Sequence, residues 1–198
     1  MRAKKGSDFE REFCKLLSRW WTKGVEGVGR DDVFWRTSQS GGRATQRAKF
    51  GRKTYGSQGD VAAVDPIGTP FLRFFTVELK RGDSHGNPME LFDALPSDKI
   101  RDWEKALAQA RLSAKQAGTE WLLVLRRDRR VPMVYLDVRV AKRLGLAGCL
   151  PSMRFRVVVN GVGEMRYVCL PLHIFLRKLH PDDIIGHARN DAGKQNER

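Results

Sequence analysis

What this sequence lacks argues against several classes of protein. No apolar run approaches the roughly 20 residues that a membrane-spanning helix requires, and residues 1–5 are basic, unlike the apolar part of a secretory signal. The three cysteines, Cys14, Cys149 and Cys169, are too few and too widely spaced for a disulfide framework, and none has a zinc-type spacing to histidine. We therefore expect a cytoplasmic protein with reduced thiols, no membrane partner and no structural zinc.

Acidic residues are also scarce. The chain has 23 Asp and Glu against 37 Lys and Arg, a formal net charge of +14, which favours an anionic partner, most simply nucleic acid. Residues 41–59 contain no acidic residue, and their basic members are Arg43, Arg47, Lys49, Arg52 and Lys53. A loop of this length is typically functional or disordered. We expect these side chains to bind phosphates; a solvated, flexible insertion is the alternative.

Residues 59–80 read as two β-rich runs around a turn. Asp65, Pro66 and Gly68 lie between the runs and are typical turn residues, so the pattern predicts a β-hairpin. Asp60 opens the first run, and Glu78 closes the second. The hairpin would bring these two carboxylates together.

The end of the second run has the residue types of a metal site. Because side chains alternate along a strand, Glu78 and Lys80 share one face, while Val77 and Leu79 face a core. Two carboxylates, from Asp60 and Glu78, and the main-chain carbonyl of Leu79 can hold a hard cation such as Mg²⁺. Lys80 can orient or deprotonate a water molecule there. A solvated Glu–Lys pair at a strand end is the alternative.

Residues 7–21 have the periodicity of an amphipathic helix, with Ser7 as the predicted N-cap. Glu12 lies on one flank of the helix, three residues from Lys15, and is expected to form a solvated pair. Glu10 lies beside the apolar stripe without a cation at i+3 or i+4, so it requires another partner, such as a metal ion. A capping box with Ser7 is the alternative. The stripe comprises Phe9, Phe13, Leu16, Leu17 and Trp20.

These motifs resemble a known superfamily. Asp60 followed by Glu78-Leu79-Lys80 looks like the Asp…(Asp/Glu)-X-Lys signature of the PD-(D/E)XK nucleases, with Gly59 where that family has proline. Residues 5–17, with Glu10 first in Glu-Arg-Glu, are similar to the opening helix of archaeal-type Holliday-junction resolvases, where this glutamate serves the metal site. Arg36 and Ser38 match an arginine and small residues that follow the first strand in that branch.

The resemblance implies a Mg²⁺-dependent endodeoxyribonuclease, with Mn²⁺ as a substitute ion, that hydrolyses phosphodiester bonds in branched or duplex DNA. It also implies a role in recombination and a homodimer. A phage or mobile element would be the source, which would place the enzyme in the host cytoplasm. Glu10, Asp60, Glu78 and the Leu79 carbonyl would hold the metal, and Lys80 would act on the water. The expected DNA contacts are Arg36, Ser38, Arg43, Arg47, Lys49, Arg52, Lys53 and Arg81. A non-specific or restriction-type nuclease and a non-catalytic nucleic-acid-binding module are the alternatives.

The remaining pattern completes an α/β fold. We expect a helix over residues 98–117, on which Gln109 is a weak candidate for the metal site, then strands at 121–125 and 133–138 and a short helix at 140–144. A second hairpin at 155–170 and a helix at 172–179 follow. The predicted class is a restriction-endonuclease-like core: a central mixed sheet flanked by helices, in αβββαβ order, with a C-terminal hairpin and helix extension. The predicted divisions are a core at 1–138 with a basic loop at 38–58, an extension at 139–185, and a disordered tail at 186–198.

Overall fold

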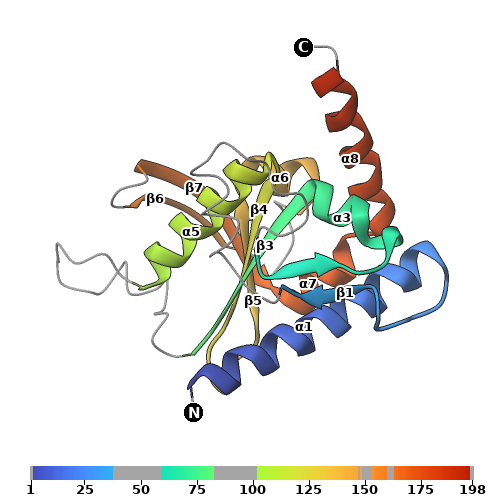
Figure 1. Cartoon of the computed structure of the whole chain (residues 1–198). Coiled ribbons are helices and arrows are strands. Elements are labelled where there is room, and N and C mark those ends of the chain that lie inside the picture. The colour runs from blue at the N-terminus through green and yellow to red at the C-terminus, as the bar shows by residue number, and fades with distance from the viewer. Residues whose placement is uncertain are drawn as a thin grey trace, which may run out of the picture.

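The computed structural model describes residues 2–37, 59–82, 102–146, 148, 153–159 and 163–196. Within them, a five-stranded sheet has the order β3-β4-β5-β7-β6, and β1 and β2 form a separate two-stranded sheet (Figure 1). Strands β3 (Phe75–Arg81) and β4 (Glu120–Arg126) are parallel, and the other neighbours in the large sheet are antiparallel. The sheet is therefore mixed, as predicted. Apart from two short helices at residues 66–74, the first elements follow the predicted order αβββαβ.

Helix α1 (Arg2–Val25) is longer than predicted at both ends. It begins at Arg2, so Ser7 lies inside the helix and the prediction that it is the N-cap is wrong. The predicted apolar stripe is largely confirmed, because Phe9, Phe13 and Leu17 are buried in the core. Leu16 is instead exposed and Trp21 is buried, since the 3.6-residue period continues along the stripe to position 21.

The predicted hairpin at residues 59–80 is wrong. Strand β2 (Val61–Ala63) pairs with β1 (Phe34–Arg36), and not with β3. The 3₁₀-helix η1 (Pro66–Gly68) and the helix α3 (Thr69–Phe74) separate β2 from β3. The short helix forms because its two buried aromatic residues recur at a helical spacing and pack into the core, at Phe71 and Phe74.

The large sheet separates two groups of buried side chains. On one face, α1 and residues of α3, α7 (Leu172–Lys178) and α8 (Pro181–Asn196) form a core with Leu122 and Val124 of β4. On the other face, α5 (Asp102–Ala117) packs on Leu123 and Leu125 of the same strand. β4 is buried on both sides, which explains its continuous apolar sequence. Helix α5 is also the crossover that joins the parallel strands β3 and β4.

The C-terminal part belongs to the same sheet and core. After β5 (Met133–Asp137) and α6 (Val138–Arg143), β6 (Met153–Val159) and β7 (Gly163–Pro171) form the predicted hairpin, and β7 pairs with β5. In the structure, α8 continues to Asn196, over residues for which the sequence analysis expected a disordered tail. Ile184 and Ala188 bury this helix in the core. Contacts with distant residues therefore stabilise a helix that the polar sequence of this segment did not predict.

Candidate active site

Strand β3 presents Glu78 and Lys80 on the face that α5 covers. Glu78 is only 2% exposed, and its Oε1 atom accepts a hydrogen bond of 2.9 Å from the Ser113 hydroxyl of α5. Its Oε2 atom lies 3.4 Å from Nζ of Lys80. Val77 and Leu79 belong to the core on the opposite face. The alternation predicted for these four residues is confirmed.

Asp60 reaches this strand from the smaller sheet. Its amide N–H donates to the Val77 carbonyl at 2.8 Å, and its Oδ2 atom accepts a hydrogen bond of 2.7 Å from the amide of Leu79. These two bonds hold Asp60 against β3 although β2 does not pair with that strand. The expected meeting of Asp60 and Glu78 thus occurs by a different route.

Gly59 makes this docking geometrically possible. Its φ angle is +82°, and a Cβ atom there would lie 2.5 Å from the Val77 carbonyl oxygen. Proline is restricted to φ near −65°, so it cannot adopt this conformation, and any side chain would push β3 away. The glycine in place of the superfamily's proline is therefore a structural requirement of this chain.

The surroundings of Asp60 oppose its ionisation. Asp60 is 4% exposed. Its burial and the adjacent negative charge of Glu78 raise the pKa of Asp60 from 3.8 to about 6, and the Leu79 hydrogen bond and the charge of Lys80 only partly counter this rise. A buried carboxylate pair is costly unless a cation compensates it. This donor set fits a hard divalent cation, which prefers oxygen ligands.

Glu10 has a protein partner of its own. Its side chain is 25% exposed, and its Oε2 atom lies 3.4 Å from the guanidinium of Arg36, which also donates to the Ser7 hydroxyl at 2.9 Å. The sequence analysis expected Glu10 to require a partner from outside its own helix, such as a metal ion, and in the structure β1 supplies Arg36. Glu12 differs from the expectation, since its partner is Arg126 at 2.7 Å.

The charges of Glu10 and Asp60 both act on the buried thiol of Cys14. Burial raises the pKa of Cys14 to about 12, and the charges of Glu10 and Asp60 add to this rise, whereas Arg36 opposes it. Both carboxylates thus lie near one thiol. Among the described residues, however, no three His, Cys, Asp or Glu side chains form a cluster that could hold a metal ion. The close pair is Asp60 and Glu78, and the partner of Glu10 is Arg36.

Most of the predicted DNA contacts cannot be placed. Of the predicted set, Arg36 is described beside Glu10, and Arg81 lies 3.7 Å from Asp128. Ser38, Arg43, Arg47, Lys49, Arg52 and Lys53 lie outside the described residues.

Comparison with known proteins identifies the family. A family model described as "Phage putative PDDEXK endonuclease" matches residues 1–185. The chain belongs to this family. Neither the curated proteins nor the solved structures contain a significant match to it.

Membership places the chain in the PD-(D/E)XK superfamily, as the sequence motifs predicted. The match also extends through the segment that the sequence suggested as an addition to the core. This agrees with the position of β7 inside the central sheet of the protein. No helix in the described part of the chain is long and apolar enough to cross a membrane.

The sequence analysis missed one residue of the site. Gln109, the suggested polar residue of the covering helix, is exposed, whereas Ser113, one turn later, bonds Glu78. Ala110 and Ala114 are both buried against the sheet. Ser113 lies within the same stripe of small residues. Its position in that stripe is the sequence feature that could have indicated that it faces β3.

Proposed function

We propose that this endonuclease is a Mg²⁺-dependent endodeoxyribonuclease that hydrolyses phosphodiester bonds in DNA, with Mn²⁺ as a substitute ion. The observation that supports this most strongly is the buried pair of Asp60 and Glu78 with Lys80 beside it. The two carboxylates and the Leu79 carbonyl would hold the ion, and Glu10 would bind it directly or through water. When bound, the ion supplies positive charge that activates water and stabilises the transition state.

The protein's own side chains supply the remaining chemistry. Lys80 orients the attacking water and donates a hydrogen bond to the oxygen on which negative charge develops. Ser113 and Leu79 fix Glu78 and Asp60, respectively, through the hydrogen bonds described above. Arg36 binds a backbone phosphate, and Glu10 orients its guanidinium. Contacts of this kind position DNA without reading its sequence.

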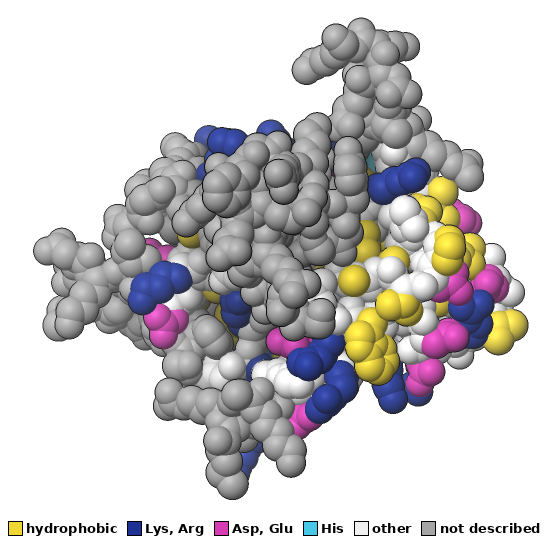
Figure 2. Space-filling view, viewed as in Figure 1, with side chains coloured by type: hydrophobic (Ala, Val, Ile, Leu, Met, Phe, Trp, Pro, Cys, Tyr) yellow, Lys and Arg dark blue, Asp and Glu magenta, His cyan; other side chains and the backbone are white. Residues whose placement is uncertain are grey.

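Branched DNA is the substrate that we propose, with a homodimer cutting two strands during recombination in the host cytoplasm. The motif at residues 5–17, which is similar to the opening helix of archaeal-type Holliday-junction resolvases, supports this choice. The proposed DNA contacts are Arg36, Ser38 and Arg81, together with the basic residues of the 38–58 loop. On the face seen in Figure 2, the described Lys and Arg side chains form separate groups, several of them beside Asp and Glu. The loop is included because it holds five basic residues, Arg43, Arg47, Lys49, Arg52 and Lys53, and no acidic one.

A direct test uses three labelled substrates of matched sequence: a four-way junction, a linear duplex and a single strand. Each is incubated with Mg²⁺ and, separately, with EDTA. Preferred cutting of the junction with Mg²⁺ alone supports the proposal. Equal cutting of all three would indicate a non-specific or restriction-type nuclease, and binding without cleavage would indicate a non-catalytic module.

Ser113→Ala should raise the Mg²⁺ concentration needed for half-maximal cleavage about tenfold. The substitution removes a hydrogen bond to a charged group, worth roughly 1.5–3 kcal/mol, and so releases Glu78 from one of its two partners. Cleavage rates over a Mg²⁺ titration measure the effect, and Ser113→Thr should restore part of it. Gln109→Ala, on the exposed side of the same helix, is the matched control. An unchanged Mg²⁺ dependence in Ser113→Ala would remove Ser113 from the site.

Charge reversal of Arg47 and Arg52 together should flatten the salt dependence of DNA binding. Each phosphate contact contributes about −0.9 to the slope of log affinity against log salt on duplex DNA, so two lost contacts should reduce the slope by about 1.8. Fluorescence anisotropy in EDTA over a salt series measures it. Reversal of Arg177 and Lys178, both exposed on α7, is the control. An unchanged slope would exclude both arginines from the DNA contact.

A further inference from the structure

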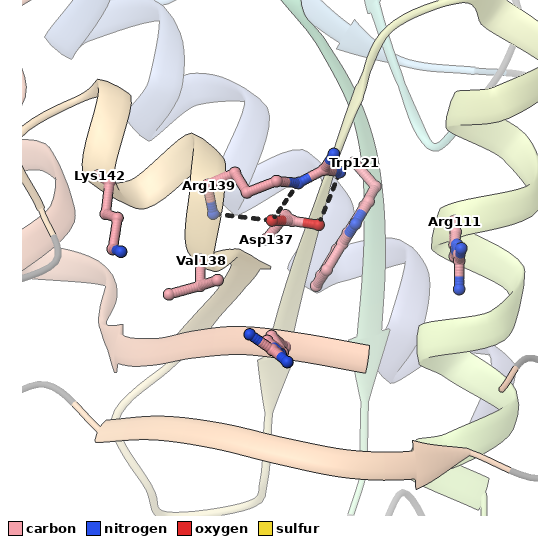
Figure 3. Close-up of a pocket in the computed structure, with 7 residues that line it drawn as sticks. Arg111, Trp121, Asp137, Val138, Arg139 and Lys142 are labelled. Carbon is pink, nitrogen blue, oxygen red and sulfur yellow. Dashed lines mark hydrogen bonds and ion pairs between the residues drawn. The ribbon is translucent and has the colours of Figure 1, made fainter. Parts of the chain in front are cut away.

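A second concentration of positive charge lies in a pocket of about 480 Å³ between α5, β4, α6 and β7. Four of its lining side chains are cationic: Arg111, Arg139, Lys142 and Arg166. Asp137 is the single acidic member, and Trp121 and Val138 form the apolar part of the wall (Figure 3). Four cations against one carboxylate leave three net positive charges around one hollow. Such a pocket favours an anionic ligand.

The one carboxylate is already neutralised from within the pocket. Asp137 accepts hydrogen bonds from the Arg139 backbone at 2.7 Å and from its guanidinium at 3.1 Å. This pairing also fixes the start of α6, because Asp137 is the N-cap residue of that helix. Asp137 is therefore paired with Arg139, and the lining holds three further cationic side chains, those of Arg111, Lys142 and Arg166.

The pocket is separate from the carboxylate site. Trp121 pairs in register with Thr76 on β3, two residues before Glu78, and Asp137 lies on β5, two strands away from β3. With about 3.3 Å per residue along a strand and about 4.8 Å between strands, the backbones of Glu78 and Asp137 are on the order of 12 Å apart. That separation corresponds to about three or four nucleotides along one DNA strand, at 3.4 Å each.

We propose that this pocket binds backbone phosphates of a nucleic-acid strand, away from the bond that is cut. The cations come from three separate elements, and Figure 3 shows Arg111, Lys142 and Arg139 at different sides of the hollow. This arrangement suits a run of phosphates better than a single phosphate ion. The inference rests on the proposed function only in taking nucleic acid as the ligand, because binding here requires no cleavage.

The test is the double substitution Lys142→Glu with Arg166→Glu, measured by anisotropy of a labelled duplex in EDTA over a salt series. Neither residue belongs to the carboxylate site. We expect affinity to fall at least tenfold at low salt, with a salt slope reduced by one to two units. The neutral pair Lys142→Gln with Arg166→Gln, which introduces no repulsion, should show a smaller loss in the same direction. Reversal of Arg177 and Lys178 should leave affinity unchanged.

Competition by inorganic pyrophosphate and by a mononucleotide distinguishes a strand from a free phosphate. The proposal would be overturned if pyrophosphate or the mononucleotide binds the pocket while the double variants keep the duplex affinity of the wild type. It would also be overturned if the double variants bind all of these ligands as tightly as the wild type does. Circular dichroism of each variant establishes that it is folded. If the wild type does not cleave DNA but the double variants lose duplex affinity, phosphate binding in the pocket is supported and the proposed nuclease function is contradicted. If the wild type cleaves DNA and the double variants bind the duplex as tightly as the wild type, the nuclease is supported and the pocket is contradicted.

Discussion

Lys80→Ala will abolish cleavage and leave DNA binding nearly intact. The Lys80 amine lies 3.4 Å from a buried Glu78 oxygen, where it can act on water and on the developing charge but contributes little to the grip on DNA. Loss of one hydrogen-bond donor to a transition-state oxyanion typically costs about 10²–10³ in rate, and loss of water orientation adds to this. Single-turnover cleavage with Mg²⁺ and anisotropy in EDTA measure the two quantities separately.

The matched control is Lys105→Ala, which removes an exposed lysine that pairs with Asp102 on α5. It should change neither cleavage nor binding. Loss of binding together with cleavage in Lys80→Ala would contradict the role assigned to Lys80, and so would cleavage at the wild-type rate. Since Lys80 partly counters the repulsion between the two carboxylates, the variant should also be somewhat less stable than the wild type without metal.

Asp60→Asn should stabilise the metal-free protein and inactivate the enzyme. The pKa of Asp60 is about 6 in the folded chain against 3.8 unperturbed. Between these values the folded state keeps a proton that the unfolded state has released, so the free energy of unfolding falls as pH rises from about 4 to about 6. At about 1.36 kcal/mol per unit of pKa, the loss is on the order of 2–3 kcal/mol. Asparagine still accepts the Leu79 hydrogen bond but carries no charge.

Denaturant unfolding in EDTA at several pH values measures this effect. The wild type should lose stability across that window, and Asp60→Asn should lose less. Addition of Mg²⁺ near neutral pH should stabilise the wild type, because ligands that bind the folded state do so, and should leave Asp60→Asn unchanged. Asp31→Asn, at an exposed ion pair with Arg19, is the control. Equal pH profiles for Asp60→Asn and the wild type would contradict the buried carboxylate pair.

Local periodicity predicted those parts of the site that lie within one element. Alternation along β3 placed Glu78 and Lys80 on one face and Val77 and Leu79 in the core, and the helical period placed Phe9, Phe13 and Leu17. The strand pairing could not be predicted in this way. Nothing in residues 59–80 shows that β2 pairs with β1 across the intervening basic loop.

Partners from distant parts of the chain explain the remaining differences. Arg36 lies 26 residues from Glu10, so the helical pattern around Glu10 could not reveal it. Ser113 lies 35 residues from Glu78 and reaches it only because α5 crosses β3. The helix at the C-terminus is stabilised by burial of Ile184 in the core, whereas composition alone indicated a polar tail.

The central claim is that Asp60 and Glu78 together hold a divalent cation. Calorimetric titration of Mn²⁺ into the DNA-free protein tests this claim most directly. The comparison is between the wild type and Glu78→Gln, which keeps the shape of the side chain and removes its charge. We predict that the wild type binds Mn²⁺ and that Glu78→Gln binds it at least tenfold more weakly, since a hard cation depends on carboxylate charge. The same affinity and stoichiometry in both proteins would contradict the account.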